Sequence, residues 1–562
     1  MMPTTPNNPP CSGGELLMRC LVGLGARKGF GVPGESYLAV LDAMYDHRDA
    51  FDFILARQEG GAAYMAAAWG KLTGEPGICF VTRGPGATNA AVGVHTAMQD
   101  SLPMLLFIGQ VGNDMAGREA FQEIDYEAFF GPIAKWAVQI NDADRIPEIV
   151  SRAWTTALSG RPGPVAIALP ETMLTAMTDA MPCGPVAIPE PAPSLDEIAR
   201  VKTMLAEAER PLIIVGGTRW QEASSRAVEQ FAMANDIPVV AAFRFHDLID
   251  NYADCYVGDA GVGMLGYMKD LLGKADLILA LNVRFGEMTT GAYSIFETPR
   301  MAARLIHSHA SDRELGKIYV ADLPLHAGPN RMAAALADLR LDEKATRTAW
   351  ATETRAAYLD SFGAPQQPGD VYMREIMAYL QNVLPDDAII THGAGNFAIW
   401  PNKFMKFGAS ARMLGPQSGT MGFGVPAAIA AKAHDPSRFV LCFAGDGDFQ
   451  MNGTELGAAM QAGLAPVFIV LNNSSYGTIR MHQERTYPER VSGTDIVNPD
   501  FAALAKAYGM HGETVLKTAD FADAFERSRN APKGAVIEIR IPTEAISPRA
   551  TVSGLRAAAR ST

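Results

Sequence analysis

The sequence has little of what marks secreted or membrane-spanning proteins. Its six cysteines are scattered through 562 residues, without the paired spacing of a zinc site or the density of a disulfide scaffold. No apolar run approaches the ~18 residues that a membrane-spanning helix needs, and the N-terminal segment lacks the basic and apolar stretches of a targeting signal. We therefore expect a cytoplasmic protein with unpaired thiols, no membrane contact and a frayed leader over its first 14 residues.

Positive charge is also scarce. Lys and Arg together number 48 against 61 Asp and Glu, which gives a formal net charge of -13 at pH 7. Binding to a phosphate backbone needs clustered Lys and Arg, and no such cluster occurs, so we expect no nucleic-acid partner. Apolar residues make up 48% of the chain, and 53 Gly and 36 Pro accompany them, a composition typical of a folded protein with many turns.

Two proline-rich stretches divide the chain into three segments. They are Met181–Ser194 and Gly363–Asp370, where helix and strand are both disfavoured. We therefore predict domains over residues 1–180, 195–345 and 370–562. Within each, short β-branched runs alternate with alanine-rich stretches, which predicts an α/β protein with three doubly wound parallel sheets. The predicted strands include Phe51–Leu55, Gly77–Thr82, Pro211–Val215, Leu277–Leu281 and Phe439–Phe443.

The third segment contains one strand–turn–helix–strand unit with polar residues after both strands. It runs through the strand Arg438–Ala444, the turn Gly445-Asp446-Gly447-Asp448, the helix Met451–Ala462 and the strand Pro466–Leu471, and ends in Asn472-Asn473. Because the crossover between parallel strands is right-handed, the two strand ends lie side by side. Asp446 and Asn473 can then face the same point in space.

Both of these side chains offer oxygen, the ligand atom that Mg2+ prefers. An octahedral Mg2+ that also holds phosphate oxygens needs one or two such ligands, and Ser475 is placed to add a backbone carbonyl. Gly445 and Gly447 let the backbone approach a diphosphate, whose charge suits the N-terminus of the following helix. A bare Gly-Asp-Gly is usually a tight turn, but the whole unit matches the cofactor motif of the thiamine diphosphate enzymes. The sequence resembles this family over nearly its whole length, with pyrimidine-binding, central and diphosphate-binding domains implied.

The resemblance implies a set of cofactor residues. In the related acetohydroxyacid synthases, Arg-His-Glu-Gln carries the glutamate that hydrogen-bonds the pyrimidine ring, and Glu59 matches it, with Gln58 in place of His. Taken alone, Glu59 would be interpreted as a solvated carboxylate in the first turn of a helix. Met421 matches the bulky residue that bends the cofactor, although a Met near glycines is usually core. The resemblance also places Pro33, Gly34, Asn89, Asn396, Gly419, Gly445, Gly447, Asp448, Tyr476 and Gly477 at the cofactor.

Several motifs resemble acetohydroxyacid synthase in particular. They are Gly84-Pro85-Gly86-Ala87-Thr88-Asn89, Gly109-Gln110-Val111, Ala120-Phe121-Gln122-Glu123-Ile124-Asp125, Lys135-Trp136 and Gly160-Arg161-Pro162-Gly163-Pro164-Val165. Carried over, Asn89 borders the pyrimidine, while Phe121 and Gln122 approach the thiazolium and the keto acid. Simple core packing is the alternative for Phe121.

Three departures from the synthases bear on the substrate and the cofactors. Glu35 stands where the synthases have glycine, and simple 2-keto acid decarboxylases carry an acid there, which favours protonation and aldehyde release. His482 stands where the biosynthetic synthases have the tryptophan that favours 2-ketobutyrate, and the surrounding Tyr-Gly-x-x-Arg also resembles benzoylformate decarboxylase. Arg284-Phe285-Gly286-Glu287 resembles a flavin motif, but Met288 replaces its second arginine and no Gly-x-Gly-x-x-Gly opens a helix, so FAD is left open.

The resemblance implies an acetolactate synthase-like carboligase that decarboxylates pyruvate and joins the acetyl unit to a second 2-keto acid. The alternatives are a 2-keto acid decarboxylase of the benzoylformate type, an aldehyde lyase, and a non-catalytic thiamine diphosphate-binding subunit. Retention of Glu59, Asp446, Asn473 and Met421 disfavours the last of these. The family architecture also implies a homodimer as the minimum, with a tetramer common among relatives and a regulatory subunit as a further option.

Overall fold

The computed structural model describes residues 9–363 and 365–561, so the first eight residues of the expected leader and Ala364 of the second predicted linker lie outside the described residues. The described chain falls into two units, each treated by itself. The first unit comprises residues up to Pro189 together with Val425–His434 and Asn452–Leu464, and the second comprises Glu190–Gly424, Asp435–Met451 and the residues from Ala465 onward.

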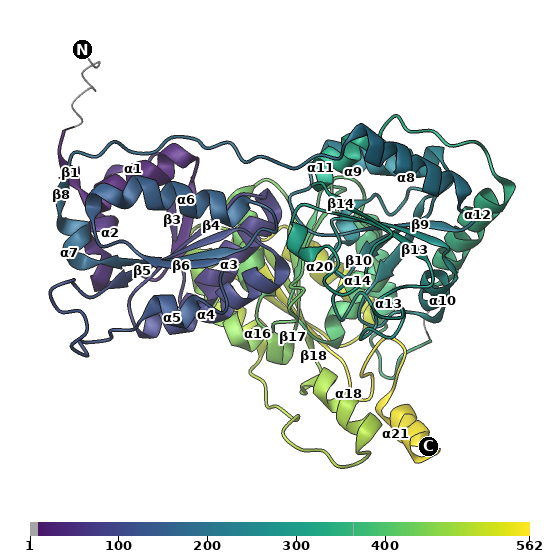
Figure 1. Cartoon of the computed structure of the whole chain (residues 1–562). Helices are drawn as coiled ribbons and strands as arrows, with labels where there is room; N and C mark the ends of the chain where they lie inside the picture. The colour runs from purple at the N-terminus through teal and green to yellow at the C-terminus, as the bar shows by residue number, and fades with distance from the viewer. Residues whose placement is uncertain (1–8, 364, 562) are drawn as a thin grey trace. The chain divides into compact units, whose positions relative to one another are not determined.

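The first unit is built on a six-stranded parallel sheet. In sheet order its strands are β3 (Asp52–Leu55), β2 (Lys28–Gly31), β4 (Gly77–Val81), β5 (Met104–Gln110), β7 (Pro164–Pro170) and β6 (Trp136–Gln139). Its helices are α1 (Gly13–Leu24), α2 (Leu38–Asp46), α3 (Glu59–Thr73), α4 (Pro85–Asp100), α5 (Tyr126–Phe130), α6 (Ile146–Leu158) and α7 (Glu171–Thr175). Figure 1 shows α1 and α6 on one face of the sheet and α4 and α5 on the other. Helices on both faces explain why β4, β5 and β7 are continuous buried apolar runs.

The N-terminal leader is more ordered than we expect from sequence. Strand β1 (Cys11–Ser12) pairs antiparallel with β8 (Met177–Thr178), and α1 begins directly afterwards with Ser12 as its cap. The expectation of fraying is therefore wrong for residues 11–14. Its physical reason is a missed helix start, since the Ser12 hydroxyl accepts a hydrogen bond from the Glu15 N–H and so satisfies a free amide of the first turn.

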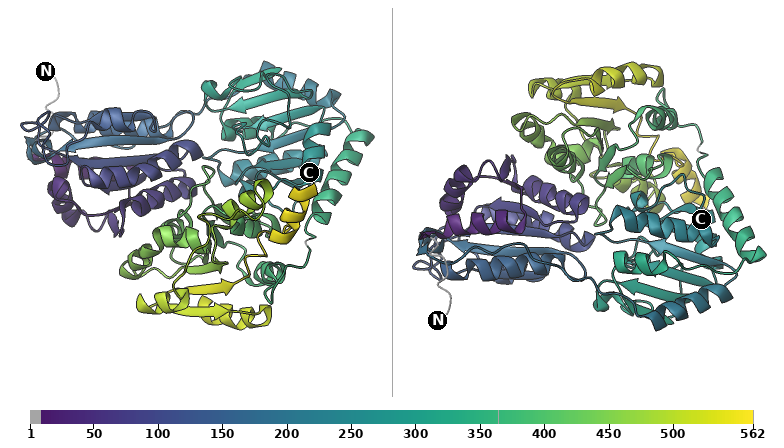
Figure 2. Two further views of the ribbon diagram at one scale, coloured as in Figure 1. Left: turned by 90° about the horizontal axis from the view of Figure 1, so that it is seen from below. Right: turned by 90° about the horizontal axis from the view of Figure 1, so that it is seen from above.

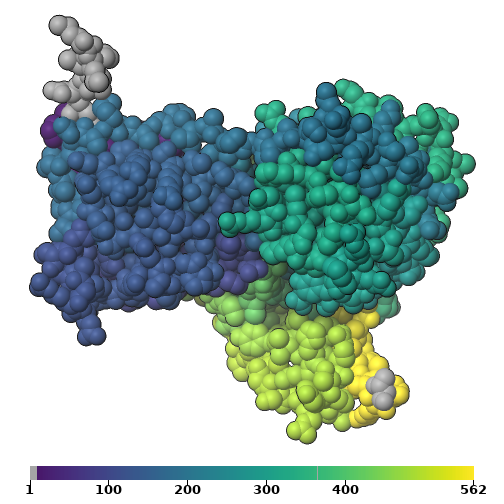
Figure 3. Space-filling view, viewed as in Figure 1, coloured from purple at the N-terminus to yellow at the C-terminus, as the bar shows by residue number. Residues whose placement is uncertain are grey.

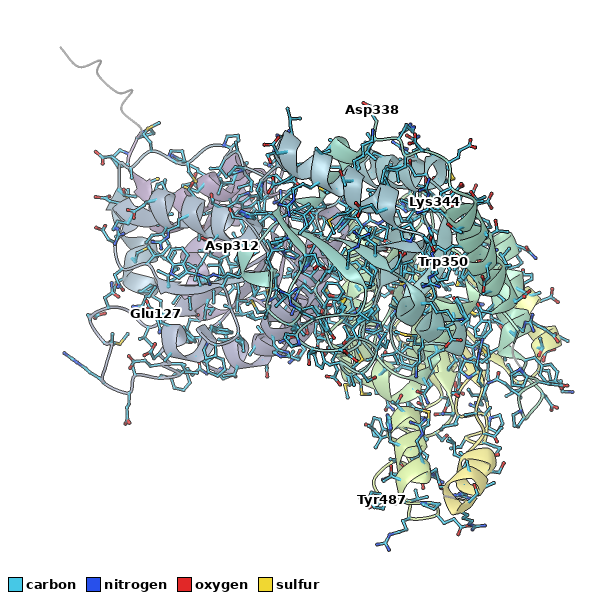
Figure 4. The ribbon with its side chains drawn as sticks, turned by 45° about the vertical axis from the view of Figure 1, so that its right-hand side comes forward. Glu127, Asp312, Asp338, Lys344, Trp350 and Tyr487 are labelled. Carbon is cyan, nitrogen blue, oxygen red and sulfur yellow. The ribbon has the colours of Figure 1, made fainter. Side chains whose placement is uncertain are left out.

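The second unit contains two further six-stranded parallel sheets, seen from two sides in Figure 2. The central sheet has the order β11 (Tyr256–Ala260), β10 (Val239–Ala242), β9 (Pro211–Val215), β12 (Leu277–Leu281), β13 (Arg304–His309) and β14 (Leu323–His326). Its helices are α8 (Leu195–Glu207), α9 (Glu222–Ala234), α10 (Gly266–Lys274), α11 (Pro329–Leu336) and α12 (Ala345–Asp360). Trp350 on α12, labelled in Figure 4, donates from its indole nitrogen to the Pro211 carbonyl at 3.0 Å and holds α12 against β9.

The C-terminal sheet has the order β16 (Arg412–Leu414), β15 (Ile389–His392), β17 (Val440–Gly445), β18 (Val467–Asn472), β20 (Ala535–Arg540) and β19 (His511–Val515). The helices after the second linker are α13 (Met373–Val383), α14 (Ile399–Phe404), α15 (Gly424–His434), α16 (Asp446–Asn452), α17 (Leu456–Gln461), α18 (Gly477–Thr486), α19 (Phe501–Ala507), α20 (Phe521–Arg529) and α21 (Val552–Ser561). Of these, α17 and nearly all of α15 belong to the first unit. The prediction of three α/β domains with parallel sheets is confirmed.

Strand order shows where each sheet can bind a ligand. The first and the C-terminal sheets share one topology, in which the order reverses between β2 and β4 and between β15 and β17 respectively. In the central sheet the reversal falls between β9 and β12. Open parallel sheets bind ligands beyond the carboxyl ends of their strands at such reversal points. The loops after β2, β4, β15 and β17 are therefore the places to look for a site.

The predicted strand–turn–helix–strand unit exists with different boundaries. Gly445 ends β17, and Asp446 is already the first residue of α16, so the predicted turn over these residues is wrong. The predicted single helix is also broken, because the 3-10 turn η6 (Gly453–Glu455) separates α16 from α17. An acidic residue at a helix N-terminus is favoured by the helix dipole, and here that preference outweighs the turn propensity of Gly and Asp.

The two predicted linkers lack regular secondary structure in their described residues. Met181–Ser194 contains no helix or strand, and neither do the described residues of Gly363–Asp370. All six cysteines are free thiols. Among the residues that the structure describes, no helix combines the length and apolar character needed to cross a bilayer.

Helices α18 and α21 lie side by side in Figures 1 and 3 and are joined by a buried ion cluster. The Glu484 side chain of α18 is fully buried. It accepts hydrogen bonds from Arg480 Nε at 2.8 Å and from Arg556 Nε and Nη2 at 2.7 Å each. The bond to Arg556 is the largest cause that lowers the pKa of Glu484 to about 2. Tyr487, just after α18 and labelled in Figure 4, is exposed.

We expect Arg556→Ala to lower the free energy of unfolding by roughly 1.5–3 kcal/mol at neutral pH, the usual effect of losing a hydrogen bond to a charged group. The folded-state pKa of Glu484 is about 2 against an ordinary 4.5, so its stabilisation is present above pH 4.5 and is lost as the pH falls toward 2. Thermal midpoints of wild type and variant should differ at neutral pH and converge in acid. Arg485→Ala, exposed on the same helix, is the control, and equal losses in both variants would exclude this role.

Candidate active site

The reversal point of the C-terminal sheet holds a cavity of about 220 Å3. Its walls come from the loop after β15, the junction of β17 and α16, and the loop after β18. The structure brings eleven of the predicted cofactor residues to this cavity, namely Asn396, Gly419, Met421, Gly445, Asp446, Gly447, Asp448, Asn473, Ser475, Tyr476 and Gly477. Residues far apart in the sequence thus converge on one site because parallel strands end at the same edge of the sheet.

Asp446 is the acidic group of this cavity. Its side chain is almost fully buried, and the burial raises its pKa above the ordinary value. Oδ1 accepts a hydrogen bond from the Gly447 N–H at 3.0 Å, and Oδ2 accepts one from Asn498 Nδ2 at 2.8 Å. A cation beside the carboxylate would offset the penalty of burying its charge. The group therefore fits the role of a metal ligand.

The loop after β18 supplies the remaining oxygens. Asn473 follows β18 directly, and its Oδ1 accepts a hydrogen bond from the Ser475 N–H at 3.2 Å. The Ser475 hydroxyl donates to the Thr494 carbonyl at 3.0 Å, and Thr543 Oγ1 donates to the Asn473 carbonyl at 2.8 Å. These bonds fix a tight turn on the cavity wall. Carboxylate and amide oxygens on one wall, with the first turn of α16 beside them, are the donor set that Mg2+ and a diphosphate require.

Asp448 turns its side chain toward the protein backbone. Oδ1 accepts hydrogen bonds from the Gly422 N–H at 2.8 Å and the Ala394 N–H at 3.2 Å. Burial raises the pKa of this carboxyl to about 7. Asp448 thereby joins α16 to the two loops that carry Asn396 and Met421. Its side chain shapes the cavity by holding those loops.

Asn498 is a site residue that the sequence analysis missed. Its Nδ2 donates to Asp446 Oδ2 and to Asn472 Oδ1, both at 2.8 Å, and its Oδ1 accepts from Gln450 Nε2 at 2.8 Å. It lies in an irregular segment between α18 and α19, where no motif or periodicity draws attention to it. The amide orients the Asp446 carboxylate from outside the cavity.

We expect Asn498→Ala to weaken Mg2+-dependent binding of thiamine diphosphate roughly 10-fold to 100-fold, the usual effect of removing a residue that orients a metal ligand. The measurement is a calorimetric titration of the chain with the cofactor at fixed Mg2+. Asn530→Ala is a matched control, because Asn530 Nδ2 donates to the Glu526 carbonyl on the exposed part of α20. Equal affinities in wild type and Asn498→Ala would show that Asn498 does not orient the ligand.

The first unit brings Glu59 and Asn89 together. Glu59 is the first residue of α3, and the Gln58 side chain caps the helix by accepting from the Gly61 N–H at 3.1 Å. Asn89 Nδ2 on α4 donates to Glu59 Oε2 at 2.9 Å. The two residues that the resemblance places beside the pyrimidine are thus direct neighbours, and Glu59 sits at a helix N-terminus just beyond the end of β3.

The reversal point of the first sheet gathers the other predicted residues. Pro33, Gly34 and Glu35 follow β2, and this loop is tied to the loop after β4, because the Arg83 N–H donates to Ser36 Oγ at 3.3 Å. Glu35 is exposed. These positions lie at the carboxyl ends of the strands, where a ligand of this sheet would bind.

Phe121 and Gln122 belong to an exposed loop of the first unit. The Phe121 side chain is 74% exposed, so core packing, the alternative for this residue, is wrong. Gln122 has a φ of 64°, a backbone conformation that is unfavourable for a residue with a side chain and that clusters at functional sites. An added Cβ on Gly84 would lie 2.7 Å from the Gln122 Cβ, which places Gln122 against the loop after β4.

His482, a predicted substrate-pocket residue, does not line the cavity of the second unit. It is exposed on α18, whereas Thr478 and Ile479 from the first turn of the same helix do line the cavity. Helix α18 therefore borders the cavity through its first turn, and the role of His482 in a substrate pocket stays a prediction.

The place expected for a flavin is the reversal point of the central sheet. Gly216 and Gly217 follow β9, but an added Cβ on Gly217 would collide with the Asn282 side chain, so the chain itself fills that side of the loop. Trp220 Nε1 donates to the Gly216 carbonyl at 2.8 Å and covers the loop further. Met288 stands in place of the second arginine, so the motif that resembles a flavin site is incomplete in this chain.

Comparison with protein families agrees with this geometry. Residues 11–129 match the N-terminal TPP binding domain of thiamine pyrophosphate enzymes, residues 198–336 match the central domain, and residues 393–539 match the C-terminal TPP binding domain. Glu59 and Asn89 fall within the first match, and Asp446 and Asn473 fall within the last.

Curated relatives extend the similarity to nearly the whole chain. The acetolactate synthase large subunit of Parasynechococcus marenigrum (strain WH8102) is 33% identical over 514 residues, 89% of this chain and 83% of the relative. That of Lactococcus lactis subsp. lactis (strain IL1403) is 34% identical over 515 residues, 89% of this chain and 88% of the relative. The acetolactate synthase isozyme 2 large subunit of Escherichia coli (strain K12) is 28% identical and covers 94% of this chain and 95% of the relative. The chain belongs to the thiamine pyrophosphate enzymes and is an acetolactate synthase-like member of that family.

Proposed function

We propose that this chain decarboxylates pyruvate and joins the resulting acetyl unit to a second 2-keto acid, with thiamine diphosphate and Mg2+ bound. The observation that carries the proposal is the cavity at the end of the C-terminal sheet. Asn473 and the first turn of α16, which begins with Asp446, both line it. The relatives named acetolactate synthase support the choice of reaction. When bound, thiamine diphosphate supplies a nucleophilic carbon and an electron sink for the decarboxylation.

The residues of the C-terminal domain would hold the charged end of the cofactor. Asp446 and Asn473 would offer side-chain oxygens and Ser475 a backbone carbonyl to Mg2+, and the N–H groups of the first turn of α16 would be available to the diphosphate. Met421 and Gly419 line the same cavity and would support the bend of the cofactor. These residues would therefore bind and orient the cofactor.

Glu59 would hold and exchange the proton at the pyrimidine. Asn89 already donates to Glu59 Oε2, which leaves Oε1 for the cofactor ring. Proton exchange by a positioned carboxyl contributes about 100-fold to 10,000-fold in comparable reactions. The exposed loop of Phe121 and Gln122 would approach the keto acid, with Gln122 as its polar group.

Simple decarboxylation is the second candidate, because Glu35 presents an exposed carboxyl at the reversal point of the first sheet. A carboxyl there can deliver the proton that ends the reaction at an aldehyde. The benzoylformate-type decarboxylases and the aldehyde lyases are enzymes whose reactions end in this way, with release of an aldehyde. A non-catalytic subunit is a weaker candidate, because the chain retains both Glu59 and Asp446.

We also propose the assembly and location of the enzyme. Glu59 and Asp446 belong to different domains, and we expect two copies of the chain to supply them to one site, so the homodimer is the smallest active form. The relatives are large subunits by name, which makes a separate regulatory subunit a further expected partner. Six free thiols suit the reducing cytoplasm.

The test is a proton NMR product assay of the purified chain with thiamine diphosphate, Mg2+ and pyruvate, run with and without FAD. Acetolactate is the expected result, and the comparison of the two reactions shows whether FAD is needed to form it. Acetaldehyde alone would assign the chain to the decarboxylases and give Glu35 its acid role. No product from pyruvate or from larger and aromatic keto acids would contradict the proposed function.

A further inference from the structure

A buried carboxylate from outside the N-terminal sequence segment lies against the turn that carries Glu59. Glu455 ends the 3-10 turn η6, immediately before α17, and its side chain is fully buried. It belongs to the first unit together with β3 and α3. Burying a charged carboxylate is unfavourable unless polar groups replace water around it, so its partners indicate what it is for.

Those partners are the main-chain amides of the two residues before Glu59. The Arg57 N–H donates to Glu455 Oε1 and Oε2 at 3.1 Å and 3.0 Å, and the Gln58 N–H donates to Oε1 at 3.0 Å. The Arg57 guanidinium turns to α17 instead, where Nη2 donates to the Gly457 carbonyl at 2.9 Å and to Gln461 Oε1 at 2.6 Å. Glu455 thus holds the backbone of the turn between β3 and α3, and α17 holds the Arg57 side chain of the same turn.

Gly61 shows that the chain makes room for this carboxylate. An added Cβ at position 61 would lie 2.5 Å from Glu455 Oε1 and 2.8 Å from its Cδ. Any other residue in the first turn of α3 at this position would therefore displace the carboxylate or the helix. The glycine and the buried acid form one arrangement at the N-terminus of the helix that begins with Glu59.

We propose that Glu455 is a positioning residue for Glu59, which fixes the turn between β3 and α3 and so the place of the Glu59 carboxylate toward the cofactor. This inference rests on the proposed function of Glu59. Two charged groups face Glu455, Arg57 and Glu59. Burial is the largest cause that raises the pKa of Glu455 to about 7, and the nearby charge of Glu59 raises it further. The two carboxylates are thus also coupled through their charges.

The experiment compares Glu455→Gln with wild type in the full chain. Gln keeps the shape of the side chain but points an N–H2 at one of the two amide donors, so the turn loses part of its support. In the cofactor-free chain, hydrogen exchange of the Arg57 and Gln58 amides should become faster. In the loaded enzyme, exchange of the C2 hydrogen of bound thiamine diphosphate should slow roughly 10-fold to 100-fold, as for other residues that orient a site residue. kcat should fall, with KM for pyruvate changed little.

A double-mutant comparison separates positioning from a general structural role. In a Glu59→Gln background, Glu455→Gln should slow C2 exchange by less than about 2-fold, because residues that act as a unit have non-additive effects. The control is Glu513→Gln, which removes a carboxylate on β19 that accepts a hydrogen bond from Arg527 of α20. It should change none of these readouts. Glu455→Asp keeps the charge one methylene shorter and should restore part of the rate.

Two outcomes would overturn the inference. One is a double mutant slowed by the product of the two single effects, and the other is a folded Glu455→Gln enzyme with wild-type amide and C2 exchange. If Glu455→Gln yields no folded chain by circular dichroism, Gly61→Ala and Glu455→Asp test the same arrangement, and unchanged C2 exchange in both would also overturn it. An unaffected Glu59→Gln enzyme would instead contradict the proposed function itself.

Discussion

Glu59→Gln is expected to lower kcat with pyruvate by roughly 100-fold to 10,000-fold, the contribution of a positioned acid–base group. Gln has nearly the same shape, but it cannot hold or release a proton at the cofactor ring. Asn89 Nδ2 can still donate to the amide oxygen, so the local structure should persist. Steady-state kinetics with saturating cofactor measure the loss, and a calorimetric titration should show that binding of Mg2+ and thiamine diphosphate is retained.

The matched control is Glu75→Gln, an exposed glutamate just after the opposite end of α3. It should leave kcat unchanged, which would show that the loss in Glu59→Gln belongs to that position and not to the charge of the helix. Near-normal turnover in Glu59→Gln would show that Glu59 has no acid–base role. The proposed role of Glu455 in positioning Glu59 would then lose its basis.

Asp446→Asn is expected to weaken Mg2+-dependent binding of thiamine diphosphate by more than about 100-fold, beyond the loss typical of an outer partner such as Asn498. The substitution keeps an oxygen but removes the charge that attracts the cation. Fluorescence titration at several Mg2+ concentrations measures the affinity. The Mg2+ dependence itself should largely disappear.

The same variant should not destabilise the cofactor-free chain. Burial raises the folded-state pKa of Asp446 above its unfolded value, so the stability of the folded chain falls as the pH rises and the group ionises, and at neutral pH the charge opposes folding. Asp446→Asn removes that charge, and its thermal midpoint should equal or exceed that of wild type. Asp435→Asn, a partly buried acid between α15 and β17 whose carboxylate accepts hydrogen bonds from Ser437, is the control for the affinity measurement. A variant that lost stability but kept its affinity would contradict a metal role.

The sequence could predict those parts of the site that depend on the order of strands and helices along the chain. Asp446 and Asn473 each follow a strand of one crossover unit, and the handedness of that unit brings them to one edge of the sheet. The start of α16 could not be predicted well, because Gly and Asp also favour turns and only the folded context selects the helix. Strand order was beyond reach as well, since it depends on which helices pack on which face.

Residues that act through others left no signal in the sequence. Asn498 reaches Asp446 from an irregular segment, and Glu455 reaches the amides of Arg57 and Gln58 across almost 400 positions of the chain. Neither lies in a short motif, and both are defined by a hydrogen-bond partner that only the fold brings near. His482 was selected from a family position alone, and with its side chain exposed on α18 its role in a substrate pocket stays a prediction.

The central claim is carboligation, and the ratio of CO2 released to pyruvate consumed tests it most directly. With pyruvate as both donor and acceptor, one CO2 should appear for every two pyruvate molecules consumed, because the second molecule keeps its carboxylate in the product. One CO2 for each pyruvate, with acetaldehyde as the product, would mean that a proton, and not a second keto acid, completes the reaction, and would contradict the account.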